Sequence, residues 1–340
     1  MKACALGRDP GHRSRRRAVL AALACGPFLV RAQISTNRKR LVVVGFPEMF
    51  PGPNGLEEVV RILAQRGLAE GRQIEVVRAV IDPSGETSKR KGLDYLVPEI
   101  ERKVLPLKPD VIVTVGSIMT KGLHVATRTI PIVTTAADPV ALGVAASLAR
   151  PGGNVTGLAQ GVAETSVKTM EVVKALVPHL ARVAIFHDAR PVAVNFAGHY
   201  ERAARTVGLE PVMVSSMDPE ELIRKLRSVA ANRVQAGVLA WPPEGSEAFI
   251  RSAIAVRLPL LGLQEHSAEA GCIASYYASE PPVPPRLAPI VDQVLRGADA
   301  GSIPFQYPQT FRLVINLRAA AALGIKVPAE LIIRADRVIE

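Results

Sequence analysis

The sequence predicts an α/β protein of two doubly wound parallel-sheet lobes that are joined by hinge segments. Short apolar runs alternate with amphipathic stretches, which is the pattern of parallel strands connected by helices. The same order of elements occurs twice, first over residues 40–158 and again from residue 182. The chain has 340 residues, 48% hydrophobic and 21% charged, which suits two packed domains and excludes a disordered chain.

Each expected strand is an apolar run bounded by turn residues. In the first half, strands are expected at 41–45, 74–77, 110–115, 131–135 and 155–158, with helices at about 55–66, 93–105 and 117–127. In the second half, strands are expected at 182–186, 211–214, 236–240, 258–262 and 272–276, with helices at about 196–206, 219–230 and 246–255.

The rhythm ends after Tyr277. The segment Ser279–Pro285 is proline-rich and is not expected inside a helix, so the next helix is expected only at about 287–296. We expect lobe one to hold residues 40–158 plus about 279–303, and lobe two to hold 159–278 plus about 304–340. The C-terminal pieces would then run between the lobes as hinge crossovers.

Residues 1–32 have the pattern of an export signal. Arg13 and Arg15–Arg17 precede an apolar run at 18–25, which is too short to span a bilayer. Val30–Ala32 places small residues where a signal peptidase cleaves, so the mature chain is expected to start at Gln33. We therefore expect a periplasmic protein, exported by the Sec or the twin-arginine route and without a lipid anchor.

The leader also carries much of the positive charge. Of 42 basic and 31 acidic residues, seven basic and one acidic lie in the leader, which leaves the mature chain at +5. No helix-turn-helix and no basic sheet studded with aromatic residues is recognisable, so no nucleic-acid partner is expected. Cys272 is the one cysteine outside the leader, and its apolar neighbours indicate a buried small side chain rather than a nucleophile.

Two wound sheets in one chain predict where a ligand binds. In open α/β sheets, ligands lie beyond the carboxyl ends of the strands. Two lobes would place these ends on facing walls of a cleft, which can close by hinge motion. An exported protein of this architecture is a candidate solute receptor.

Two groups of motifs resemble a known family. The central group is Ile-Pro-Ile-Val at 130–133, Asp-Pro-Val at 138–140 and Ser-Leu-Ala-Arg-Pro-Gly-Gly-Asn-Val-Thr-Gly at 147–157. The C-terminal group includes Pro-Gln-Thr-Phe at 308–311, Ile-Asn-Leu at 315–317, Ala-Leu-Gly-Ile at 322–325 and Arg-Ala-Asp at 334–336. Over about residues 40–340 the chain resembles the uncharacterised ABC-type substrate-binding proteins. That resemblance implies a type I periplasmic binding protein, and some members of the family bind tryptophan or tyrosine.

The chain departs from the family pattern at two places. Tyr277 stands where the family usually has glycine after a Ser-Tyr pair. The run Pro281–Pro285 replaces a helix start that usually contains tyrosine and arginine. Both departures are expected near the cleft, so the ligand can differ from the family's better-known ones.

Polar candidates for ligand contact follow the third and fourth strands. Gly116 and Ser117 open a helix whose free N–H groups suit a carboxylate, although Ser117 can equally be only the helix cap. The resemblance also implies a pair of small residues there. Thr135 and Asp138 come after the fourth strand. Asp138 can accept a hydrogen bond from an ammonium group, or can form a turn with Pro139 and cap the next helix.

Other candidates lie at the carboxyl ends of the remaining strands: Phe46, His187, Asp188, Trp241, Gln264, Glu265 and Tyr276. The aromatic ones, with Tyr277, suit stacking on a planar or apolar ligand, and the alternative is packing at the rim. His187 and Asp188 are adjacent on an extended chain and point in opposite directions, so they are not expected to act as an acid–base pair.

The motifs of several catalytic and cofactor sites are absent from the sequence. There is no Gly-x-Gly-x-x-Gly, P-loop, His-Glu-x-x-His, Cys-x-x-Cys or nucleophile elbow, and the histidines lie far apart. We expect no cofactor, no metal and no enzyme activity. The predicted function is the monomeric solute-binding component of an ABC importer, which delivers a small, amino-acid-like or aromatic solute to an inner-membrane permease. The alternatives are an exported hydrolase or isomerase using Asp138, His187 or Asp188, and a sensory binding protein.

Overall fold

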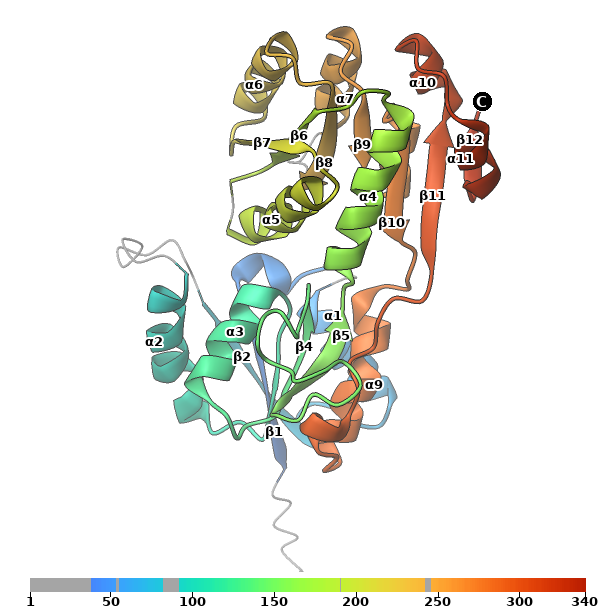
Figure 1. Cartoon of the computed structure of the whole chain (residues 1–340). Coiled ribbons are helices and arrows are strands. Elements are labelled where there is room, and N and C mark those ends of the chain that lie inside the picture. Colours follow the sequence, from blue (N-terminus) through green and yellow to red (C-terminus); the bar gives the residue numbers. More distant parts are fainter. Residues whose placement is uncertain (1–37, 53–54, 82–91, 190, 242–245) are drawn as a thin grey trace, which may run out of the picture. The chain divides into compact units, whose positions relative to one another are not determined.

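The computed structural model describes residues 38–52, 55–81, 92–189, 191–241 and 246–340. The predicted export signal and the expected mature start at Gln33 lie outside these residues. The described part contains two β-sheets, sheet A and sheet B, with helices on both faces of each (Figure 1). The α/β fold class with two wound lobes is therefore confirmed.

Sheet A is entirely parallel and has five strands in the order β2-β1-β3-β4-β5. Its strands are β1 (Lys39–Gly45), β2 (Ile74–Val80), β3 (Val111–Val113), β4 (Ile132–Ala136) and β5 (Val155–Ala159). Its helices are η1 (Pro47–Met49), α1 (Leu56–Gln65), α2 (Leu93–Lys103), η3 (Leu105–Leu107) and α3 (Ser117–Ala126).

The apolar run of β1 fills two cores at once, because successive side chains of a strand point to opposite faces. Leu41 and Val43 pack with α1 and with α9 (Val283–Leu295), whereas Val42 and Val44 pack with α2 and α3. A strand covered on both faces needs apolar residues at every position, which explains the continuous run in the sequence.

Sheet B has seven strands in the order β12-β11-β10-β9-β8-β6-β7. Its strands are β6 (Arg182–His187), β7 (Glu210–Ser215), β8 (Ala236–Trp241), β9 (Leu260–Gly262), β10 (Ala274–Ala278), β11 (Phe311–Asn316) and β12 (Arg337–Ile339). Its helices are α4 (Val162–Leu176), α5 (Pro191–Thr206), α6 (Pro219–Ala231), α7 (Ser246–Ala255), α8 (Glu265–Glu269), α10 (Leu317–Ala322) and α11 (Ala329–Arg334).

Sheet B differs from the expected parallel sheet at one edge. Strand β11 runs antiparallel to β10, and β12 pairs in parallel with β11. The strand expected at 272–276 is therefore not the last strand of sheet B. The cause is the path of the chain, which leaves β10 for α9 on sheet A and returns from the opposite end. Elsewhere the two faces alternate as in sheet A: Val183 and Ile185 pack with α4 and α5, whereas Ala184 and Phe186 pack with α6 and α7.

Three described segments connect the two sheets: residues 160–161 before α4, residues 279–282 before α9, and residues 303–310 before β11. They are hydrogen-bonded to each other or to the adjoining strands. Ser279 N donates to the carbonyl of Thr310 at 2.9 Å, and Ala159 N donates to that of Gln306 at 2.8 Å. These three segments are called the crossovers below.

Helix α9 begins four residues earlier than the sequence predicted. Proline is disfavoured inside a helix because it lacks an N–H, but the first turn needs no such donor. Pro284 and Pro285 occupy that first turn, after the cap residue Pro282. The proline-rich run therefore starts the helix instead of preceding it.

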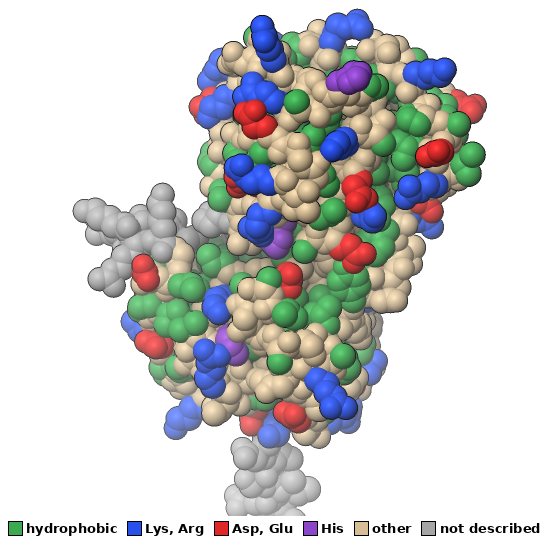
Figure 2. Space-filling model, viewed as in Figure 1, with side chains coloured by type: hydrophobic (Ala, Val, Ile, Leu, Met, Phe, Trp, Pro, Cys, Tyr) green, Lys and Arg blue, Asp and Glu red, His purple; other side chains and the backbone are tan. Residues whose placement is uncertain are grey.

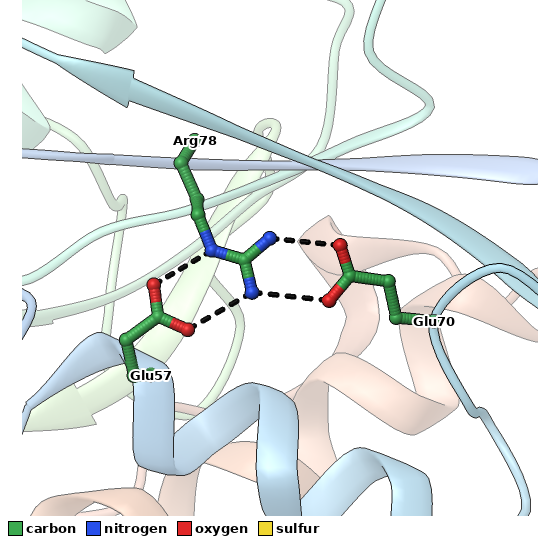
Figure 3. Close-up of polar contacts among 3 residues, drawn as sticks. All are labelled: Glu57, Glu70 and Arg78. Atoms are coloured by element: carbon green, nitrogen blue, oxygen red, sulfur yellow. Dashed lines mark hydrogen bonds and ion pairs between the residues drawn. The ribbon is translucent and has the colours of Figure 1, made fainter.

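The outer edge of sheet A carries a network of charges (Figure 3). Arg78 of the edge strand β2 donates to Glu57 of α1 at 2.7 and 2.9 Å, and to Glu70 at 2.8 and 3.0 Å. On the face drawn in Figure 2, basic and acidic side chains are interspersed. Among the helices of the described ranges, none combines the length and apolarity needed to cross a bilayer.

Candidate ligand-binding site

A cavity of about 570 Å³ lies where the crossovers meet the two sheets. Sheet A contributes the ends of β4 and β5, and sheet B contributes α4, α5, the turn after β9 and β10. The residues around it are Thr135, Leu158, Ala159, Gln160, Val162, Thr165, Phe196, Tyr200, Leu263, Gln264, Glu265, Tyr276, Tyr277, Ala278, Glu280, Pro281, Pro282, Val283, Arg286 and Pro308. The two sheets and the crossovers therefore share one site.

Aromatic side chains form much of the wall on the side of sheet B. Phe196 and Tyr200 lie one turn apart on α5, with ring centroids 5.6 Å apart. The ring of Tyr276 stacks on Phe311 at a centroid distance of 6.1 Å and an interplanar angle of 11°. Burial raises the pKa of both Tyr200 and Tyr276, so their phenols stay neutral. These rings suit a ligand with an aromatic or apolar body.

A pair of opposite charges faces this cavity. Arg286 of α9 and Glu280 of the crossover approach to 3.7 Å between Nη2 and Oε2, and each side chain is 17% exposed. Glu280 Oε1 accepts hydrogen bonds from the backbone N–H groups of Gln309 at 2.7 Å and Thr310 at 3.0 Å. Burial pushes the pKa of Glu280 upward, but these donors and Arg286 outweigh it, and the pKa is lowered. Glu280 is therefore a carboxylate at neutral pH.

The second carboxylate of the cavity, Glu265, is engaged on both oxygens. Its Oε1 accepts from Arg337 Nη1 at 2.7 Å, and its Oε2 accepts from the hydroxyl of Tyr277 at 3.2 Å. The hydrogen bond from Arg337, followed by that from Tyr277, lowers the pKa of Glu265. Glu265 therefore serves mainly to fix the position of its neighbours.

The chain enters α4 through a tight passage beside the cavity. Gly161 has a φ of +66°, and a Cβ atom there would lie 2.8 Å from the hydroxyl of Tyr307. That hydroxyl donates to Glu164 Oε2 at 2.6 Å. Glycine is required because of its backbone conformation and because a side chain would collide with Tyr307.

Four of the predicted contact residues line this cavity, namely Thr135, Gln264, Glu265 and Tyr276. Phe46, Gly116, Ser117, Asp138, His187 and Asp188 are not among the residues that line it. Trp241 ends β8, and its side chain lies outside the described part of the chain. Ligand contact by any of these residues stays a prediction.

The polar residues that do not line the cavity have local partners. Ser117 Oγ accepts from Ala137 N at 3.0 Å, and Asp138 Oδ1 accepts from Val140 N and Ala141 N at 3.1 and 3.0 Å. The buried ring of His187 has Nδ1 2.6 Å from the carbonyl of Asp188. The turn at Asp138 is one of the two alternatives that the sequence left open.

Sequence reasoning missed Phe196, Tyr200, Glu280 and Arg286. Helix α5 begins at residue 191 rather than at about 196, so Phe196 lies in its second turn instead of at its start. Glu280 and Arg286 flank the proline run that the sequence marked as unusual. That run was the available signal in the sequence. The neighbouring residues do not show, however, that Glu280 and Arg286 line a cavity together with residues of both sheets.

The described residues offer little for metal binding or nucleophilic chemistry. Within them, no group of three or more His, Cys, Asp or Glu side chains is arranged to hold a metal ion. Cys272 is fully buried, and burial raises the pKa of its thiol to about 12. The features of the site that can recognise a ligand are therefore its shape, its aromatic walls and its pair of opposite charges.

Comparison with known proteins agrees with this geometry. The sequence pattern of the ABC transporter substrate binding protein family matches residues 65–339. The chain belongs to this family. Substrate-binding proteins of ABC transporters typically act outside the cytoplasm, in the periplasm or at the cell surface.

Individual relatives support the same conclusion. The tyrosine-binding protein of Clostridioides difficile (strain R20291) is 25% identical over 304 residues, which are 86% of this chain and 83% of that protein. A conserved domain protein of Vibrio cholerae has a TM-score of 0.63 at 24% identity, covering 88% of this chain and 99% of that one. An ABC domain from Streptococcus pneumonia in complex with L-Trp has a TM-score of 0.60 at 20% identity, covering 89% and 100%. The predicted type I periplasmic binding protein fold is confirmed.

Proposed function

We propose that this substrate-binding protein is the periplasmic component of an ABC importer. It captures a small amino-acid-like solute with an aromatic or apolar body and delivers it to a permease in the inner membrane. The cavity between the sheets carries this proposal, because it combines aromatic walls with one pair of opposite charges. Its volume of about 570 Å³ lies within the usual range of small-molecule sites.

The position of the cavity suits capture and release. Residues from both sheets and from all three crossovers line it, so a rotation about the crossovers changes its access to solvent. The relatives that bind tyrosine or carry L-Trp make aromatic amino acids the first solutes to test. We further propose that the mature protein acts as a monomer.

The same observations argue against a catalytic role. A hydrolase or isomerase needs a nucleophile, a base and an orienting group that converge on one point. Asp138 caps a turn, and His187 has its Nδ1 against a backbone carbonyl instead of a carboxylate. We propose that the solute leaves the protein chemically unchanged.

Ligand-dependent stability tests the proposed function. The exported mature protein is heated alone and with L-amino acids, aromatic carboxylates, amines and monosaccharides. A solute at one hundred times its Kd stabilises the fold by about 2.7 kcal/mol, which corresponds to a Tm increase of about 5 °C. We expect this increase with aromatic L-amino acids and not with monosaccharides, which control for non-specific effects. An unchanged Tm across the panel would refute the proposal.

A further inference from the structure

Arg286 is a largely buried cation with few partners. A guanidinium carries five N–H donors, which need acceptors from the protein, from solvent or from a ligand. Within the described residues, its ion pair is the contact with Glu280 at 3.7 Å, which is longer than a hydrogen bond. The side chain is 17% exposed and lines the cavity. Planar donors of this kind bind carboxylates in a bidentate manner.

Glu280 offers the complementary group. Two backbone donors of the opposite crossover hold its Oε1, which fixes the carboxylate in place. Its Oε2 is directed to Arg286, but the two do not form a hydrogen bond. This oxygen can accept a hydrogen bond from a ligand cation beside Arg286.

The balance of charge selects the ligand class. Both carboxylate oxygens of Glu265 are hydrogen-bonded to Arg337 and Tyr277. Arg286 and Glu280 are therefore the charged pair of the cavity that can still form hydrogen bonds with a ligand. A zwitterion brings both charges and leaves the site neutral. A lone carboxylate would leave an extra negative charge beside Glu280, and a lone amine would leave a positive one beside Arg286.

The proline-rich start of α9 explains why a side chain performs this task. A helix N-terminus usually offers backbone N–H groups to an anion. Here the first three helical positions are Val283, Pro284 and Pro285, so two of the three lack the donor. Arg286 comes next in the chain and supplies N–H groups from its guanidinium instead.

We infer that Arg286 and Glu280 form a clamp for the α-carboxylate and α-ammonium groups of a free amino acid. Arg286 binds the carboxylate, Glu280 Oε2 binds the ammonium group, and the side chain of the amino acid lies among the aromatic walls. This inference rests on the proposed function and adds the residues that recognise the ligand backbone.

Calorimetric titration with matched probes tests the clamp. L-Tyrosine is compared with 3-(4-hydroxyphenyl)propionate, which lacks the ammonium group, and with tyramine, which lacks the carboxylate. L-Phenylalanine is compared with 3-phenylpropionate and phenethylamine in the same way. We expect the wild type to bind at least one of the amino acids about 10- to 100-fold more tightly than either of its analogues.

Two variants should separate the two halves of the clamp. Arg286→Gln should weaken the amino acid and the propionate by about 10- to 100-fold, and it should not weaken the amine, because it removes a like charge. Glu280→Gln keeps an acceptor for the two backbone donors, and it should weaken the amino acid and the amine but not the propionate. Arg318→Gln and Glu330→Gln, on the exposed surfaces of α10 and α11, are the matched controls and should bind as the wild type.

Each outcome decides between the two proposals. If an amino acid binds but the variants weaken all three probes equally, or none of them, the clamp is wrong and the binding function stands. The clamp is also wrong if the wild type binds a solute that is not an amino acid. If the wild type binds no solute of the whole panel, the proposed function fails and the clamp fails with it. Melting temperatures of both variants near that of the wild type show that the fold is intact.

Discussion

Two arginines of this protein stand in opposite electrostatic situations. Arg78, at the outer edge of sheet A, is 35% exposed and makes four contacts of 2.7–3.0 Å with two carboxylates (Figure 3). Arg286, in the cavity, is 17% exposed, and among the described residues its one ion pair with a carboxylate is 3.7 Å long. The more buried cation therefore has the fewer partners, which is the reverse of what stability alone favours.

The difference between the two arginines is that one charge is used to hold the fold together and the other is available to a ligand. The hydrogen bonds of Glu57 and Glu70 raise the pKa of Arg78, and that of Arg78 in turn lowers the pKa of Glu70. The donors of Arg78 are thus used within the fold, where they connect α1, β2 and the turn between them. Arg286 instead lines a cavity that also has aromatic walls. Substitutions at the two places should consequently affect different properties.

Apart from the two clamp residues, the largest effect is expected from the aromatic wall of the same cavity. Tyr276→Ala removes a ring that lines the cavity, and we expect aromatic amino acids to bind about 30-fold more weakly, a loss of about 2 kcal/mol. Tyr276→Phe keeps the ring and should change the Kd by less than about threefold. Calorimetric titration measures both.

The matched control lies on the other side of that ring. Phe311 stacks on Tyr276 but is not among the residues that line the cavity. Phe311→Leu should therefore leave the Kd nearly unchanged. An equal loss in both variants would show that the stacked pair acts through the shape of the site and not through contact with the ligand.

A smaller effect is expected from the two arginines on stability. Arg78→Gln should lower the free energy of unfolding by about 1 kcal/mol, since the network is partly exposed and screened by solvent. Its effect on ligand Kd should be negligible. Arg286→Gln should change stability by less than about 0.5 kcal/mol, because its ion pair is long. Urea denaturation measures these differences.

Salt sharpens this prediction. Because the contacts of Arg78 are partly exposed, the difference between wild type and Arg78→Gln should narrow in 1 M NaCl. A difference that persists at high salt would mean that Arg78 stabilises sheet A mainly by packing.

The smallest effect is a dependence of stability on pH. The buried ring of His124, on α3, has Nδ1 3.1 Å from Asn154 Oδ1, and its Nε2 contacts Arg128. Burial lowers its pKa below 6.5, and the charges of Arg128 and Lys121 act in the same direction. Below about pH 6.5 the unfolded chain therefore binds more protons than the folded one, so stability falls as the pH falls toward the folded pKa.

A variant isolates the contribution of this histidine. His124→Gln should show a shallower loss of Tm between pH 7 and pH 5 than the wild type. Some slope should remain, because burial also lowers the pKa of His199. Identical slopes in the two proteins would mean that His124 does not titrate in this range.

Most of the fold could be predicted from the sequence. Strands covered on both faces have nearly continuous apolar runs, so the runs that became β1 and β6 could be recognised from the sequence alone. Candidate contacts such as Thr135 and Tyr276 followed from the rule that ligands bind at strand carboxyl ends. Both line the cavity.

The path of the last sixty residues could not be predicted in the same way. Helix α9 packs on α1, more than 200 residues earlier in the chain, and β11 then joins sheet B in the antiparallel direction. The amphipathic pattern of α9 shows that it has an apolar face but does not show which sheet that face covers. In the same way, the direction of β11 depends on the end of sheet B at which the chain returns after α9, and the local sequence does not show this.

The sequence by itself determined the period of the elements, their repetition and the family, because backbone geometry and burial impose these patterns on neighbouring residues. Only the tertiary structure decided which charges remain available. Arg286 and Arg78 are the same residue type in sequence, and their difference arises from distant chain segments: the packing of α9 on sheet A places one guanidinium at the cavity, and α1 brings a carboxylate to the other. Whether a charged side chain has an oppositely charged partner depends on distances in the folded protein, and these distances cannot be read from the spacing of residues in the sequence.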